Sequence, residues 1–404
     1  MSGRVKARRP VGSASISRLG LLILLIVLLV AQLPVLSDLT VRGAVYESQG
    51  ITDLGRDLLG VTVVEEGGMP YQQIGDLLSQ YEPPDLPLSD APRLSGWVVH
   101  PPLALAGARA LLAIYGSDAE SAGRRLGALG VVALAFAIIA ILHRRKPAWA
   151  IPVAIATVVW VPTFTDTVWI QGNALAGLGL LVVVLLDGKG RRVVALIILG
   201  LLVAWKPWLA VFALALPRST SVVKDVAVVA GTAALATLAA LPFVGGFDSL
   251  WAWITEALPG NTAEARDTPS NLSWISPAGP GLATLVYLGA ALAIPMIRRR
   301  FPREIWLLLP VWVATALAPF VWDHYWLALA PVVWFVVSRV KSDLRLPAFS
   351  WIGLAVLPMA LSRLGQPGLE NRVVPMVLAG ASLCVGVVGS SLFIRLRGGA
   401  ERVD

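Results

Sequence analysis

The sequence predicts an all-α polytopic membrane protein with about 11–13 transmembrane helices and a large first extracytoplasmic loop. Of its 404 residues, 56% are hydrophobic and 14% are charged, and the mean hydropathy is +0.74. Soluble domains carry about 25% charged residues, so this composition excludes a water-soluble globular enzyme. A chain of this length instead supplies about ten to twelve apolar runs, each near the roughly 20 residues that cross a bilayer.

Basic clusters set the predicted orientation. The apolar run 19–36 follows a basic segment, 1–18, and no small-residue cleavage site comes after it. We therefore expect a retained first helix with a cytoplasmic N-terminus. Later basic clusters return after even numbers of crossings, at 143–146, 189–192, 218–224, 298–303, 339–345 and 395–402. Residues 19–394 are accordingly predicted to form one transmembrane domain in the plasma membrane, with a cytoplasmic basic tail at 395–404.

The apolar runs give the predicted crossings, which lie near 19–36, 126–142, 148–166, 171–186, 193–205, 207–217, 222–243, 281–297, 305–321, 325–338, 348–362 and 373–394. The two runs that flank Lys206-Pro207 are too short to span at about 1.5 Å per residue. We expect them to form a shallow hairpin or broken helices buried in the protein. The short apolar segment 103–115 precedes arginines on the outer side and is interpreted as an interfacial or re-entrant helix.

The outer loops are unequal, and the largest is acidic. Residues 37–101 contain ten acidic residues and three arginines, so this loop carries −7 in a protein of net charge +8. Loops longer than about 12–15 residues in a compact protein are usually functional or disordered. A second outer loop, 244–280, is rich in tryptophan, whereas most cytoplasmic connections are a handful of residues. The active site is therefore predicted on the extracytoplasmic face, with loop 37–101 partly folded.

Several function classes lack support in the sequence. It contains no Walker-type G-x-x-x-x-G-K-[ST], G-x-G-x-x-G, H-E-x-x-H or G-x-S-x-G motif. A major-facilitator transporter would be expected to have two related halves. We find no such repeat between the halves of this sequence. One cysteine, Cys384, cannot form an internal disulfide, and three scattered histidines do not make a metal cluster of the usual spacing. The basic residues follow membrane topology, so nucleic acid is not an expected partner.

Two ionisable residues stand out as candidates. Asp53 lies in the acidic outer loop, where a carboxylate held at a membrane surface would serve as general base on a sugar hydroxyl. The alternative for Asp53 is an ordinary solvated loop carboxylate. Lys206 interrupts an apolar stretch, and a lysine at membrane depth is costly unless it is paired or lines a wet cavity. A lipid phosphate is its natural partner, and snorkelling toward a headgroup is the alternative.

Further polar residues recur where the chain reaches the outer face. Trp322, Asp323 and His324 join two crossings, either as a binding group for donor phosphate or sugar or as a tight polar turn. His100 precedes Pro101-Pro102, either as a rigidly presented polar group or beside a purely conformational Pro-Pro. The weaker candidates are amides that also cap helices, namely Gln171, Asn173 and Asn271.

These motifs, in this order, resemble glycosyltransferase family 87, a group of GT-C enzymes that use polyprenyl-phosphate sugars. The resemblance covers roughly residues 19–340 and rests on the ordered set rather than on any one motif. Asp53 stands seventeen positions before Pro70, as the family pattern requires. The remaining matches are Gly67-Gly68-Met69-Pro70-Tyr71, His100-Pro101-Pro102, Gln171-Gly172-Asn173, Lys206-Pro207, Asn271-Leu272-Ser273 and Trp322-Asp323-His324-Tyr325.

Three positions depart from the family pattern. Asp57 and His100 stand where the family has tyrosines, and Tyr325 stands where it has a second histidine. These departures leave the transferase class intact but bear on which sugar and which acceptor are used.

The resemblance implies a GT-C-type bundle and a bacterial, extracytoplasmic sugar transfer. The first-choice donor is polyprenyl-phosphate mannose, the second is its arabinofuranose equivalent, and the acceptor is an envelope glycolipid or glycan. Asp53 would be the base, while Lys206, His324, Asp323 and Arg266 would bind donor phosphate or sugar. The residues expected to line the substrate pocket are His100, Gln171, Asn173, Asn271 and Trp322. No cofactor is required by this scheme, and nothing in the spacing demands a metal.

Two other classes remain open from sequence. A multispan transporter or lipid flippase would also explain the hydropathy and the intramembrane Lys206. An envelope scaffold or assembly protein would tolerate loss of both Lys206 and His324. The transporter class predicts that Asp53→Asn leaves transport largely intact and that no sugar transfer is detectable.

Overall fold

A computed structural model describes residues 52–80, 96–145, 147–158, 161–217, 221–266, 273, 275, 279–301, 303, 306–322 and 324–339. Within these residues the chain is helical, and its one β contact is an isolated bridge between Gln73 and Trp97. The predicted crossings at 19–36, 348–362 and 373–394 and the two basic termini lie outside the described residues. The all-α prediction is confirmed for the described part of the chain.

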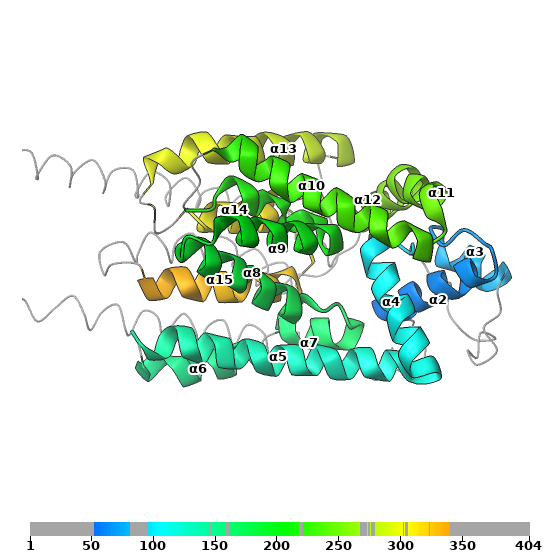
Figure 1. Ribbon diagram of the computed structural model, residues 1–404, viewed down its shortest axis with the longest axis horizontal. Helices are drawn as coiled ribbons and strands as arrows, with labels where there is room; N and C mark the ends of the chain where they lie inside the picture. Colours follow the sequence, from blue (N-terminus) through cyan, green and yellow to red (C-terminus); the bar gives the residue numbers. More distant parts are fainter. Residues whose placement is uncertain are drawn as a thin grey trace, which may run out of the picture.

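The helices form two parts, a long bundle and a smaller group at one of its ends (Figure 1). The bundle contains α5 (Ala119–His143), α6 (Pro147–Val158), α7 (Val161–Trp169), α8 (Asn173–Gly188), α9 (Arg192–Trp205), the 3-10 helix Pro207–Leu214, α10 (Val222–Ala240), α13 (Pro280–Ile297), α14 (Leu308–Trp312) and α15 (Tyr325–Arg339). We call the smaller group the cap; it comprises α2 (Asp53–Glu65), α3 (Ile74–Gln80), residues 96–101, α11 (Gly246–Ala252) and α12 (Leu258–Arg266).

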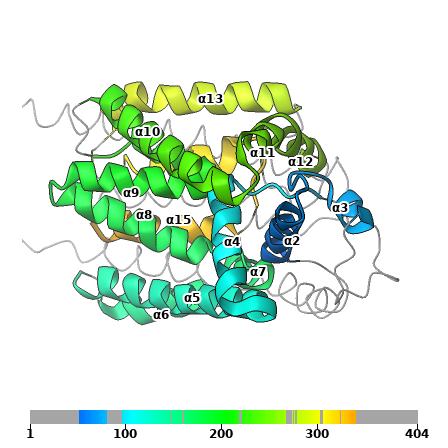
Figure 2. The same cartoon turned by 45° about the vertical axis from the view of Figure 1, so that its right-hand side comes forward.

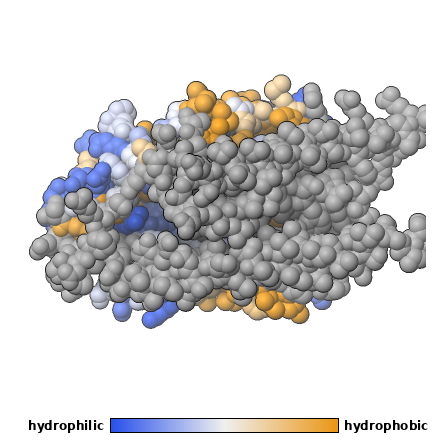
Figure 3. Space-filling view, turned by 180° about the vertical axis from the view of Figure 1, so that it is seen from behind, coloured by the Kyte–Doolittle hydropathy of each residue, from blue (hydrophilic) through white to orange (hydrophobic). Residues whose placement is uncertain are grey.

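Three helical stretches are long and apolar enough to cross a membrane, and they identify a membrane protein. These stretches are Pro102–His143, Val222–Phe243 and Pro280–Ile297, and only 22%, 17% and 17% of their apolar segments are buried inside the protein. Large apolar side chains therefore point outward, for example Phe136, Leu235 and Leu292, each about two-thirds exposed or more. Figure 3 shows, from behind, hydrophilic residues gathered at the cap end and hydrophobic residues along the body.

Several shorter apolar helices lie between these stretches, so the predicted number of crossings stays a prediction. The expected crossing 148–166 is divided between α6 and α7, and Pro162 lies in the first turn of α7. The expected crossing 305–321 contains the five-residue α14 followed by a π-helical turn, Val313–Leu317. After Lys206, the chain forms a largely buried 3-10 helix, which confirms the expected broken helix beside Lys206-Pro207.

The segment predicted to be interfacial or re-entrant forms α4 (Pro102–Tyr115), which lies across the end of the bundle between the bundle and the cap (Figure 2). Gly116 ends α4 with a φ of +54°, a left-handed conformation that L side chains rarely adopt. The chain then turns into α5 along the bundle. This separation of α4 from α5 agrees with the expected helix 103–115 and places α4 as the support on which α2 packs.

The cap has a hydrophobic core of its own, which confirms that the acidic loop is partly folded. Side chains from α2, α3, α4 and the α10–α12 region share it; they are Leu59, Val63, Tyr71, Ile74, Leu77, Leu78, Val98, Leu105, Leu241, Val244, Ala252 and Ala257. The Trp253 indole donates a hydrogen bond of 2.7 Å to the Val99 carbonyl, and Trp97 packs against Gly260. The described parts of the predicted outer loops 37–101 and 244–280 therefore meet in one folded unit.

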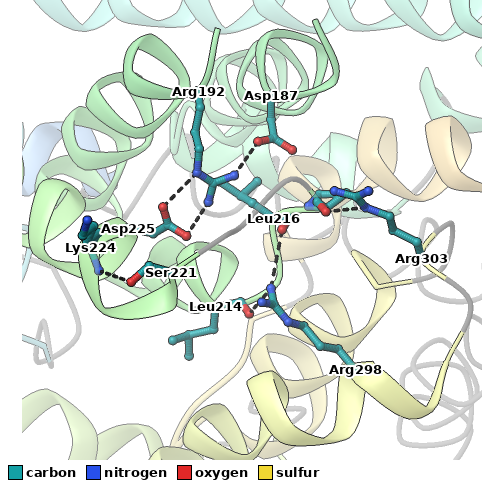
Figure 4. A network of polar contacts seen from close by, with 10 residues as sticks. Asp187, Arg192, Leu214, Leu216, Ser221, Lys224, Asp225, Arg298 and Arg303 are labelled. Carbon is teal, nitrogen blue, oxygen red and sulfur yellow. Dashed lines mark hydrogen bonds and ion pairs between the residues drawn. The ribbon is translucent and has the colours of Figure 1, made fainter. Parts of the chain in front are cut away.

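The opposite end of the bundle, which we call the basic end, is held by buried ion pairs (Figure 4). Arg192 donates to Asp187 at 2.7 Å and, through Nε, to Asp225 at 2.9 Å, so one guanidinium joins α8, α9 and α10. Arg298 donates to the Leu214 carbonyl at 3.0 Å and thereby ties α13 to the end of the 3-10 helix. The carboxylates of Asp187 and Asp225 are almost fully buried. Removing one partner of either ion pair would leave an uncompensated buried charge and destabilise the fold.

Close helix crossings in the bundle depend on glycine, and α8 against α15 gives a test. A Cβ on Gly177 would lie 2.9 Å from the Ala328 carbonyl oxygen, which is backbone and cannot rotate away. Gly231 lies in the middle of α10 with nothing within 4 Å of the same added atom. We predict that Gly177→Ala lowers the thermal unfolding midpoint of the detergent-purified protein, because overpacking costs about 1–3 kcal/mol.

The matched Gly231→Ala variant should be neutral or slightly stabilising, because alanine is about 0.5–1 kcal/mol better than glycine inside a helix. Equal melting temperatures for the two variants would contradict the described crossing.

Candidate functional site

The first part of the site is the N-terminus of α2. Thr52 caps the helix by accepting a hydrogen bond from the Gly55 amide at 2.9 Å, and its own hydroxyl donates to Glu120 on α5 at 2.9 Å. Asp53 therefore occupies the first turn, where the helix dipole favours an ionised carboxylate. Its side chain is 16% exposed and lies 3.5 Å from the Arg56 guanidinium. Asp53 is thus a fixed carboxylate rather than a freely solvated one.

One turn further along α2, Asp57 binds His100. The Nδ1 atom of His100 lies 2.8 and 3.0 Å from the two carboxylate oxygens of Asp57. Asp57 is buried, whereas the His100 ring is 21% exposed. Tyr71, of the Gly-Gly-Met-Pro-Tyr motif, packs in the cap core beside this pair, and burial together with the negative charge of Asp57 raises the pKa of its hydroxyl well above the ordinary value. Tyr71 therefore stays neutral.

The turn from α7 to α8 positions Gln171 and Asn173. Asp166 on α7 accepts hydrogen bonds from the backbone and side-chain nitrogens of Asn173, both at 2.9 Å, and from the Ala174 amide at 3.3 Å. The turn needs left-handed backbone at Ile170 and Gly172, with φ of +56° and +67°. A Cβ on Gly172 would also lie 2.9 Å from the Trp205 ring. This explains why glycine separates the two amide residues.

Lys206, which follows α9, is the buried cation of the site. The side chain is 5% exposed, and its ammonium donates to the Gln171 amide oxygen at 3.2 Å and lies 5.5 Å from the Trp205 ring centre. That is the one hydrogen bond it makes within the described residues, although an ammonium has three donors. Three carboxylates act on its charge, Asp166 most strongly, then Asp53 and Asp57. Lys206 therefore has carboxylates that favour its charged form and keeps hydrogen-bonding capacity.

Aromatic side chains border Lys206 on the side of α15. Trp208 stacks on Tyr325 with ring centres 4.6 Å apart and planes 9° from parallel. His324, 5% exposed, contacts the edge of Tyr325 at 5.2 Å between ring centres. The Lys-Pro and Trp-x-His-Tyr motifs thus meet although they are more than a hundred residues apart.

Buried polar atoms without a partner gather in this region. Within the described residues, four such atoms belong to residues of the site or its border, namely Arg56 Nε, Tyr71 Oη, Asn173 Oδ1 and Trp208 Nε1. Buried polar groups in native proteins are nearly always hydrogen-bonded, so each exception calls for an explanation. Arg56 Nε and Trp208 Nε1 are unused donors, Asn173 Oδ1 is an unused acceptor, and the Tyr71 hydroxyl can serve as either.

The structure brings together most of the residues predicted from sequence. Asp53, Lys206, His100, Gln171, Asn173 and His324 lie in one electrostatically and sterically connected group, while Trp322 packs half-buried against the bundle core. Arg266 is the last residue of α12 in the cap, and its side chain lies outside what the structure describes. Asp323 and Asn271 lie outside the described residues. Ser273, from the same motif as Asn271, donates to the Ala318 carbonyl.

Sequence reasoning missed four contributors. Asp166 is an isolated aspartate in an apolar stretch. The criterion that selected Lys206, an ionisable residue within an apolar segment, would also have selected Asp166. Asp57 was noted only as a departure from a family pattern, and its partner is 43 residues away. Trp208 and Tyr325 join the site through packing between separate helices, which no local pattern indicates.

The fold and the site together define a helical membrane protein with a charged, partly unsatisfied site where its bundle meets its cap. No protein-family model matches the chain, and no curated protein or solved structure is significantly similar to it. Within the described residues there is also no group of three or more His, Cys, Asp or Glu side chains placed to hold a metal ion.

The Asp166 contacts give a test of how the site is built. We predict that Asp166→Ala lowers the free energy of unfolding by about 1–2 kcal/mol, because it removes the carboxylate that caps α8. The thermal midpoint in detergent is the measurement. Asp118→Ala is the matched control, since Asp118 precedes α5 but makes no side-chain cap bond. Equal destabilisation by the two substitutions would refute the capping role of Asp166.

Proposed function

We propose that the protein is a GT-C-type glycosyltransferase, similar to family 87, that moves a sugar from a polyprenyl-phosphate donor to an envelope glycolipid or glycan. The placement of two residues carries the proposal: Asp53 is held in the first turn of α2, and the buried ammonium of Lys206 makes one hydrogen bond within the described residues. Such a pair offers a base for a hydroxyl and a cation for a departing phosphate within one site. The order of motifs that resembles the family supports the same conclusion.

The placement of the site supports an extracytoplasmic reaction. Basic residues lie at the ends of three bundle helices, with Arg144 and Arg145 after α5, Lys189 and Arg191 between α8 and α9, and Arg299 after α13. Figure 1 shows these helices running away from the cap. Connections rich in lysine and arginine stay cytoplasmic, which assigns the cap end to the outer face of a bacterial plasma membrane and both termini to the cytoplasm. Nucleotide sugars are absent outside the cytoplasm, so a donor carried by the bilayer is required there.

The chemistry assigned to the residues is a single displacement. The Asp53 carboxylate takes the proton of the acceptor hydroxyl as the acceptor oxygen bonds to the anomeric carbon of the donor sugar. The bond from that carbon to the phosphate oxygen breaks with its electron pair on the phosphate, and the anomeric configuration inverts. Lys206 stabilises the negative charge that develops there, and a fixed donor of this kind is worth about 10²–10³ in rate.

Mannose is the first-choice donor sugar and arabinofuranose the second, because the resemblance includes both activities. Trp208 and Tyr325 present aromatic faces beside Lys206, and His324 adds a polar edge. The other functional class, a transporter or flippase of lipid-linked substrates, is favoured by the buried Lys206 alone. The transporter class gives no catalytic role to Asp53, so the effect of replacing Asp53 distinguishes a transporter from a transferase.

The deciding experiment supplies purified protein with labelled polyprenyl-phosphate mannose, and separately with the arabinofuranose equivalent, together with crude envelope glycolipids. We predict that label enters a glycolipid from one donor and that Asp53→Asn reduces the rate at least about a hundredfold, the scale of general base catalysis. The variant should insert and melt normally, since the Asp53–Arg56 pair is partly exposed and contributes little stability.

Glu66→Gln is the matched control, because Glu66 is an exposed carboxylate at the other end of α2 and should leave transfer unchanged. Retained transfer in Asp53→Asn would remove the assigned base. Absence of transfer from either donor by the wild-type protein, with lipid movement detected instead, would favour the transporter class.

A further inference from the structure

The Asp57–His100 pair has no part in the displacement described above, yet it lies beside the assigned base. Asp53 and Asp57 are four residues apart on α2, so they lie on the same face of the helix, about 6 Å apart along its axis. Both carboxylates act on the Lys206 ammonium. His100 reaches this face from residues 96–101 of the cap, held by the contacts of Trp253 with Val99 and of Val98 with the cap core.

The contact fixes which nitrogen of His100 is available. Asp57 takes up Nδ1 with both of its oxygens, at 2.8 and 3.0 Å, which in the neutral ring places the proton on Nδ1. Nε2 is then a hydrogen-bond acceptor, and within the described residues it has no partner. The His100 side chain is 21% exposed while Asp57 is buried, so the carboxylate of the pair is buried and the imidazole is partly accessible. A carboxylate that orients an imidazole in this way is an arrangement used to bind or deprotonate hydroxyls.

We propose that His100, oriented by Asp57, binds a hydroxyl of the acceptor sugar one helical turn from Asp53. This inference rests on the proposed function and names its acceptor contact. Asp57 lies one helical turn from Asp53 and holds the His100 ring at 2.8 Å, which places the imidazole on the same face as the assigned base. Asp53 then receives the reacting hydroxyl, while Nε2 accepts a hydrogen bond from a second hydroxyl of the same sugar. Asp57 is a positioning residue that acts through His100. The pair thereby makes the site selective for an acceptor with a hydroxyl at that place.

The first test does not depend on transfer. The chain has three histidines, so protein labelled with ¹⁵N-histidine gives three sets of ring signals, and His143→Gln and His324→Gln assign them by elimination. We expect His100 to carry its proton on Nδ1 and Asp57→Asn to shift it toward the other tautomer, because an amide no longer requires a donor at Nδ1. An unchanged His100 spectrum in Asp57→Asn would overturn the orienting role.

The second test uses kinetics of the full-length protein. His100→Ala and Asp57→Asn should each raise the KM for acceptor at least tenfold and leave the KM for donor unchanged. The double variant should be no worse than His100→Ala, because Asp57 acts through His100. His143→Ala, at the basic end and exposed, is the matched control and should match wild type. Additive losses, or a rise in donor KM in place of acceptor KM, would overturn the proposal.

The two proposals fail in different ways. If neither donor supports transfer by wild-type protein, the proposed function fails, and the labelled protein is then titrated with methyl α-mannoside and methyl arabinofuranoside. Movement of the His100 signals in wild type but not in Asp57→Asn would support a sugar-hydroxyl site independent of transfer. Unmoved His100 signals with both glycosides would overturn it.

Discussion

The arrangement of this site depends on one buried cation. Lys206 is almost fully excluded from solvent, and a charge at that depth is tolerated only when other groups compensate it. Gln171 provides one hydrogen bond, and the carboxylates of Asp166, Asp53 and Asp57 provide the opposing charge. These residues come from α7, the α7–α8 turn and α2, so groups of both the bundle and the cap contribute to the surroundings of one ammonium. The cation therefore links the fold to the chemistry.

Within the described residues, Lys206 has fewer hydrogen-bond acceptors than its ammonium has donors, which leaves donors for a ligand. No carboxylate in the described residues forms a close ion pair with it, and it keeps donors that nothing there accepts. A close carboxylate would neutralise the lysine and fill its hydrogen bonds, as Asp187 and Asp225 do for Arg192 at the basic end. The two ends of the bundle thus differ. The Arg192 guanidinium is paired with two carboxylates and joins helices. The Lys206 ammonium has no close carboxylate within the described residues and keeps donors for an anion.

Sequence indicated the membrane class, the acidic loop, and the importance of Asp53 and Lys206, because charge and hydropathy are local properties of the chain. It did not indicate that Asp166 caps α8 or that Asp57 binds His100, since those pairings follow from how separate helices pack. The expected crossing 148–166 stays a prediction, and the structure describes it as two helices, α6 and α7, a division that hydropathy alone does not register. Asp323 and Asn271 remain predictions, as they lie outside the described residues.

The account is tested most directly by whether Lys206 binds a lipid phosphate. Binding of polyprenyl phosphate without a sugar is measured on purified wild-type protein, on Lys206→Met, and on Lys189→Met, whose side chain is exposed at the basic end. The account predicts that Lys206→Met weakens binding at least about tenfold, or 1.4 kcal/mol, while folding and the control's affinity are retained. Equal affinity of all three proteins for the lipid phosphate would contradict the central claim.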